Sequence, residues 1–145
     1  MAAAPEPERA ERPKRSYASR WKHGSLLTGG YLVVPSTFLR HYATLKPHPL
    51  TSGEALFVLQ LMGFKWDAEP PFPGYKTLAQ RMGISVKMAR RHAQNLEGKG
   101  YLKREMRTGQ TNRFDLTPLF DKLNDAQEAE ANAAKRKPTA TAAQT

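Results

Sequence analysis

The sequence predicts an α+β domain that is mainly helical and carries one small β-hairpin. Apolar residues recur at helical spacing in several segments. Two short helices around Gly83 are then followed by two strand-like runs, residues 101–106 and 113–116. We expect residues 21–125 to form one domain. We expect residues 1–20 to be a disordered basic tail rich in Pro and Ala, and residues 126–145 to be a fraying helix and a disordered tail.

The lead-in to this domain reads as a strand followed by a helix. Residues 30–34 (GYLVV) follow a Gly-Gly pair and are β-branched and aromatic, so they predict a short strand that Pro35 breaks. Ser36 is placed to cap a helix that runs to about Leu45.

The next helix begins with a capping box formed by Thr51 and Glu54. Apolar residues surround much of its circumference, so we expect it to be the most buried helix. Residues 64–74 contain three prolines and predict the loop that leads to the following helix.

Gly83 and Ser85 mark a tight turn between two helices. A glycine adopts a positive φ at little cost, and a serine hydroxyl can accept a bond from the free amides of a first helical turn. The second helix should cover residues 86–97, with a single apolar stripe made by Ala89, Ala93 and Leu96.

Two glycines, Gly98 and Gly100, end this helix before the predicted hairpin. After the hairpin, Thr117 has the position of an N-cap and Pro118 that of the first helical residue. Beyond Ala126 only alanines occupy the apolar positions, so this last helix should fray there.

The positive charge is concentrated in one part of the chain. Residues 75–113 hold ten Lys or Arg and two Glu, a balance of +8, so the remaining residues carry only +2 of the total of +10. A basic excess on a helix pair and hairpin is typical of a protein that binds a polyanion. The alternative is a solvated helix face.

The residues give no indication of catalysis, a metal or a cofactor, so we expect no enzyme activity. There is no cysteine, and the four histidines lack the spacing of metal ligands. The segment 98–100 lacks the upstream Gly of a phosphate-binding loop. No apolar run approaches the ~20 residues of a membrane span, and no signal region precedes the domain, so we expect a cytoplasmic, nucleoid-associated protein without a membrane partner.

Three segments carry a resemblance to a known family: FPGYKTLAQRMGIS (residues 72–85), ARRHAQNLEGKGYLKR (89–104) and TNRFDLTPLF (111–120). Together they resemble the winged helix-turn-helix domain of phage and plasmid replication initiators. One departure is Gly74, which occupies a helix-start position often filled by Ser. The resemblance implies a DNA-binding domain with the strand-helix lead-in described above.

The resemblance also implies which residues contact double-stranded DNA. The second helix of such a motif enters the major groove with its N-terminal half nearest the bases. The candidate contacts lie on the two helices of the motif and on the hairpin: Lys76, Arg81, Ser85, Lys87, Arg90, Arg91, Gln94, Arg107, Gln110, Thr111, Asn112 and Arg113. Ser85 could serve as a cap alone, and Arg90 or Arg91 could read a guanine or bind phosphate. We expect Arg107 and Arg113 to be exposed at the hairpin end.

Three functions remain open from the sequence. The first is origin recognition in phage or plasmid replication, with replication proteins as partners and a possible homodimer. The second is transcription regulation by the same module, and the third is a domain used only for protein contact. The shared chemistry of groove binding does not separate the first two.

Overall fold

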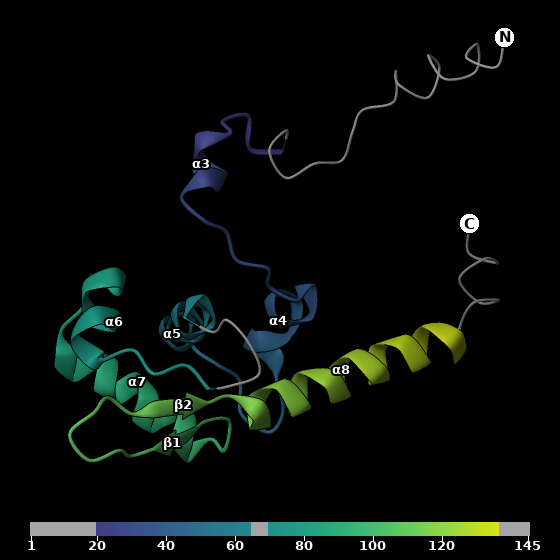
Figure 1. Ribbon diagram of the computed structural model, residues 1–145. Helices are drawn as coiled ribbons and strands as arrows, with labels where there is room; N and C mark the ends of the chain where they lie inside the picture. The colour runs from purple at the N-terminus through teal and green to yellow at the C-terminus, as the bar shows by residue number, and fades with distance from the viewer. Residues whose placement is uncertain (1–19, 65–69, 137–145) are drawn as a thin grey trace, which may run out of the picture. The chain divides into compact units, whose positions relative to one another are not determined.

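The computed structural model describes residues 20–64 and 70–136 (Figure 1). The chain divides into two units, residues 1–33 and 34–145. In the first unit the described part contains one short helix, α3 (Ser25–Thr28). The tail predicted for residues 1–20, apart from Arg20, and the end of the tail predicted for residues 126–145 lie outside the described residues.

The strand predicted for residues 30–34 is wrong. These residues form no ladder, and Tyr31 and Val33 expose 66% and 70% of their surface. Strand propensity depends on a neighbouring strand edge and a surface to pack on. Among the described residues, the sheet consists of β1 and β2 alone, and residues 30–34 pair with neither strand.

The second unit begins with α4 (Ser36–His41) and the 3₁₀ helix η1 (Tyr42–Thr44). The predicted helix is therefore confirmed in its extent, but its cap is Pro35 and not Ser36, which is already helical. Phe38 points into the core and its ring stacks on Tyr42 at 5.7 Å.

Helix α5 (Ser52–Gly63) has the predicted capping box: the Thr51 hydroxyl accepts from the Glu54 amide, and the Glu54 carboxylate accepts from the Thr51 amide. It supplies the centre of the core through fully buried side chains, among them Phe57, Val58 and Leu61. The unpredicted feature is that Glu54 itself is buried.

Helices α6 (Tyr75–Met82) and α7 (Val86–Gly98) follow the predicted turn. Gly83 has φ 68°, and the Ser85 hydroxyl accepts from the Met88 amide at 3.0 Å. The stripe of α7 is buried as predicted, and both helices pack on α5 and on each other (Figure 1). The orientation of α7 in the fold is therefore set by its apolar side.

The packing of α7 against the first turn of α5 is very close at one point. A Cβ on Gly53 would lie 2.7 Å from Cε1 and 3.0 Å from Nε2 of His92. The His92 ring also lies beside Phe57, with 6.1 Å between centroids, and its Nδ1 is buried without a hydrogen-bond partner among the described residues. A larger residue at position 53 would therefore require the His92 side chain or α7 to shift.

The hairpin consists of β1 (Lys103–Glu105) and β2 (Arg113–Asp115), both shorter than predicted, with Arg104 opposite Phe114. We call residues 103–115 the wing. The segment before α6 runs along the other side of β2, because the Phe114 amide donates to the Pro71 carbonyl at 2.8 Å.

Helix α8 (Thr117–Arg136) begins one residue earlier than predicted, so Thr117 is helical rather than the cap. It continues to Arg136, past Ala126, where fraying was expected. Two bonds to α4 lie along this later part: Thr37 donates to Gln127 at 2.7 Å, and Arg40 donates to Glu130 at 2.9 Å. The arginine also holds the pKa of Glu130 below its usual value. Contacts with α4 thus replace the missing apolar ones.

Candidate nucleic-acid interface

The outward side of α7 is polar and cationic. Lys87, Arg91 and Gln94 are all exposed, on the opposite side from the buried stripe. A helix held by one apolar side presents the other to solvent in a fixed orientation. These three predicted contacts are therefore together on one accessible surface.

Arg90 lies at the edge of this surface and is also exposed. Its guanidinium carbon is 5.5 Å from the ring centroid of Tyr75, the first residue of α6. A guanidinium within about 6 Å of an aromatic ring is attracted to the ring face. Arg90 therefore differs from Arg91 in having a neighbour that restrains it.

A second arginine, Arg104 of β1, connects the wing to both helices. It donates to Glu97 Oε1 from Nη2 at 2.7 Å and from Nε at 3.1 Å, and Nη1 donates to the Tyr75 hydroxyl at 3.1 Å. These bonds, Glu97 first, raise the pKa of Arg104, and the same arginine lowers the pKa of Glu97. Sequence reasoning did not single out Tyr75, Glu97 or Arg104, because their contacts join three separate elements.

The candidates on α6 and at the turn are accessible. Lys76 and Arg81 are exposed, and the Arg81 guanidinium lies over the Phe64 ring at 4.4 Å. Ser85 is exposed and acts as a cap. Because its hydroxyl accepts in that bond, it can still donate to a phosphate oxygen.

The wing is more firmly held than the sequence indicated. Arg107 is half-buried: its Nε donates to the Thr111 carbonyl at 2.9 Å, and its guanidinium lies 5.0 Å from the centroid of the Phe72 ring. The Thr111 hydroxyl donates to the Phe72 carbonyl. A Cβ on Gly74 would lie 3.4 Å from the Thr111 methyl, which is an ordinary van der Waals contact.

The other wing candidates differ in accessibility. Gln110 is exposed at the tip, and Asn112 is half-buried. Arg113 is half-buried and faces Glu105 at 3.9 Å. The expectation that Arg107 and Arg113 are both exposed is therefore wrong, because each folds against its own hairpin or the segment beside it.

One lysine of the basic segment is used inside the fold. Lys99 donates to Glu54 Oε1 at 2.5 Å and to the Pro49 carbonyl at 2.8 Å. Burial disfavours the charged form of Glu54, but Lys99, the Thr51 amide and Asn95 outweigh it and lower its pKa. This pair joins the start of α5 to the end of α7.

The basic residues of this segment divide into those that face a carboxylate and those that are available to a partner. Lys99, Arg104 and Arg113 face carboxylates. Within residues 20–64 and 70–136, the other basic residues of the segment have no carboxylate within ion-pair distance: Lys76, Arg81, Lys87, Arg90, Arg91, Lys103 and Arg107. They lie on α6, α7 and the wing.

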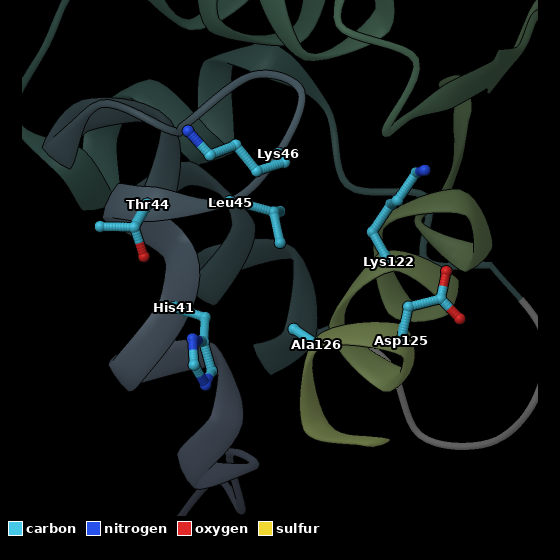
Figure 2. A pocket seen from close by; sticks show the side chains of 7 residues that line it. All are labelled: His41, Thr44, Leu45, Lys46, Lys122, Asp125 and Ala126. Atoms are coloured by element: carbon cyan, nitrogen blue, oxygen red, sulfur yellow. The ribbon is translucent and has the colours of Figure 1, made fainter. Parts of the chain in front are cut away.

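A pocket of about 330 Å³ lies elsewhere, between α4–η1 and α8 (Figure 2). Figure 2 shows His41 on one side and Lys122 and Asp125 on the other, with Leu45 and Ala126 between them. None of the candidate DNA contacts lines it. The described residues include no cluster of three or more acidic or histidine side chains that could hold a metal.

Together α6, the Gly83 turn, α7 and the wing define a winged helix-turn-helix. The family comparison agrees with this class: residues 48–102 match the profile of the family described as "Helix-turn-helix domain". The matched range contains α5, α6 and α7, and it supports a DNA-binding role for the domain. No curated protein sequence is significantly similar to the chain. No helix in the described ranges is long and apolar enough to cross a membrane.

Proposed function

We propose that this chain is a sequence-specific double-stranded DNA-binding protein rather than an enzyme, and that α7 enters the major groove. The observation that carries the proposal is the exposed cationic side of α7, fixed in orientation by its buried stripe. The major groove admits an α-helix and presents a distinct donor and acceptor pattern for each base pair. Arg90, Arg91 and Gln94 have side chains suited to that pattern.

The remaining contacts would position the domain on the backbone. Lys76, Arg81 and Lys87 are exposed cations, and Ser85 can donate to a phosphate. Contacts of this kind set register and orientation without reading sequence directly. In the wing, exposed Gln110 is the best placed side chain for the adjacent backbone or minor groove, while Thr111 and Arg107 chiefly shape the turn.

The biological role we propose is origin recognition in phage or plasmid replication initiation. The support is the resemblance carried by residues 72–85, 89–104 and 111–120. Replication proteins would be the partners, and a homodimer would bind repeated sites. The second candidate is a transcriptional regulator, because the same groove chemistry serves both. Genome-wide mapping of bound DNA separates them, since an initiator gives peaks at repeats in an origin and a regulator gives peaks at promoters.

The experiment that tests DNA binding itself is a salt titration with a random duplex. If about five of the seven cations that face no carboxylate in the described part of the chain neutralise phosphates, log K should fall with log salt at a slope of roughly −4 to −5. Replacing Lys87 and Arg91 together with Ala should make the slope shallower by about two. Lys135→Ala, in the last turn of α8, is the matched control and should leave it unchanged. A slope near zero for the wild type would refute DNA binding.

A further inference from the structure

Tyr75 is the point where the three parts of the winged helix-turn-helix meet. It is the first residue of α6 and lies under Arg90 of α7. Its hydroxyl accepts from Arg104 of β1, and its ring packs edge-on against Phe114 of β2, with 5.7 Å between centroids. A single side chain of α6 therefore contacts α7 and both wing strands.

The Tyr75 ring is itself held on several sides. Phe114 is buried and meets Phe57 of the core edge-on at 6.2 Å. Arg104, which bonds the hydroxyl, is fixed by two bonds to Glu97. The Tyr75 ring thus contacts the core through Phe114, and its hydroxyl is bonded to the ion pair of Arg104 and Glu97.

We propose that Tyr75 is a positioning residue for Arg90. Arg90, rather than Arg91, is the arginine that depends on the Tyr75 ring when it reads a base. The inference rests on the proposed DNA binding. A free arginine loses rotamer freedom when it docks on a base, and a side chain already restrained loses less. The ring attraction adds to this restraint.

The neighbours of Arg90 on α7 have no such support. Among the described residues, aromatic rings lie under Arg81, Arg90 and Arg107, and none lies under Lys87 or Arg91. Arg90 is therefore the pre-arranged cation on the groove-facing side of α7. Tyr75 holds Arg90 in this arrangement although it belongs to α6 and not to α7.

A double-mutant cycle tests the proposal, using a duplex that the wild-type protein selects from a random pool. Tyr75→Leu removes the ring and should weaken binding to that duplex by about two- to tenfold, the range for one restrained side chain. In an Arg90→Ala background the same change should alter affinity by less than about twofold. In a Lys87→Ala background the full loss should remain.

Base preference is the readout that a purely structural role would not produce. A pool selection with Tyr75→Leu should relax preference at the same base positions as Arg90→Ala and leave the others unchanged. Tyr75→Phe keeps the ring and loses only the bond to Arg104, so its coupling to Arg90 should persist. Circular dichroism checks folding, and Tyr75→Met is the second ring-free variant if Tyr75→Leu does not fold.

The outcomes separate this inference from the proposed function. Equal losses in the wild-type and Arg90→Ala backgrounds, or an unchanged affinity for folded Tyr75→Leu, would overturn the positioning role while DNA binding stands. Relaxed preference at positions that Arg90→Ala does not affect would also overturn it. A wild-type protein that selects no duplex from the pool would overturn both proposals.

Discussion

Replacing Gly53 with alanine should destabilise the domain through a single contact with His92 of α7. The new Cβ would stand 2.7 Å from Cε1 of His92, closer than carbon atoms approach in proteins. The ring has little room to move, because Phe57 lies beside it and its Nδ1 is already buried. Either the ring or the whole of α7 must shift away from α5.

The magnitude follows from two opposing effects. An alanine in a helix is favoured over glycine by about 0.5–1 kcal/mol. Inserting a methyl group into a packed contact costs about 1–3 kcal/mol. The free energy of unfolding should therefore fall by up to about 2.5 kcal/mol, which for a domain of this size lowers the melting temperature by several degrees.

The assay is urea unfolding of Gly53→Ala beside a control in the same helix. For Gly63, the last residue of α5, no atom of the described residues lies within 4 Å of the position of an added Cβ, so Gly63→Ala should be neutral or stabilising. In a His92→Ala background the contact is absent, and Gly53→Ala should no longer destabilise. The reasoning is refuted if Gly53→Ala is as stable as Gly63→Ala while His92 is present.

Three further changes test the ion pair and the two DNA-contacting parts. Glu54→Gln should lower the free energy of unfolding by about 2–4 kcal/mol at neutral pH, because the Lys99 ammonium loses its buried partner. The pKa of Glu54 is lower in the folded state than its unfolded value near 4.5. The ionised carboxylate therefore contributes fully to the free energy of unfolding above that unfolded pKa, and its contribution is lost as the pH falls through the folded-state pKa. As the pH falls, the free energy of unfolding should therefore decrease more steeply for the wild type than for Glu54→Gln. Parallel curves of unfolding free energy against pH would contradict this. Arg91→Ala should lose about 1–3 kcal/mol on the selected duplex, and less on random DNA, if it reads a base. Equal losses on both duplexes in a filter-binding assay would make Arg91 a phosphate contact. Replacing Arg107 and Arg113 together with Ala should weaken both duplexes by similar factors and make the salt slope shallower by about one to two. Unchanged affinity of the folded variant would exclude both arginines from the interface.

The helix pair could be predicted from the sequence because its signals act over a few residues. A glycine with positive φ at Gly83 and a hydroxyl cap at Ser85 are properties of one turn. The apolar stripe of α7 likewise follows from the spacing within one helix. These local signals were enough to place α6, α7 and the face that α7 turns outward.

The features that the sequence did not reveal depend on interactions between distant segments. Residues 30–34 have the composition of a strand, but a strand needs an edge that only the fold can supply. The later part of α8 has a weak apolar pattern, yet Gln127 and Glu130 bond to Thr37 and Arg40, which lie about ninety residues earlier. Composition alone does not reveal such partners.

The same limit applies to the charges of the candidate site. Counting residues gave the sign and place of the basic excess correctly, but not which cations are available. Lys99 forms an ion pair with Glu54 of another helix, and Arg104 forms one with Glu97 across the Gly98–Gly100 turn. Tyr75 was missed because its sequence position indicates only a helix start, while its importance depends on what surrounds it.

The segment beside β2 has a consequence for how the wing behaves toward the strands of other chains. A strand edge with unpaired amides and carbonyls is a template on which another chain can assemble. On the β2 side of the wing, the Pro71 carbonyl already accepts from Phe114. The outer β1 edge carries the exposed charges of Lys103 and Glu105. Both sides of the wing are therefore poor templates for the strand of another chain, one because it already has a partner and the other because it is charged.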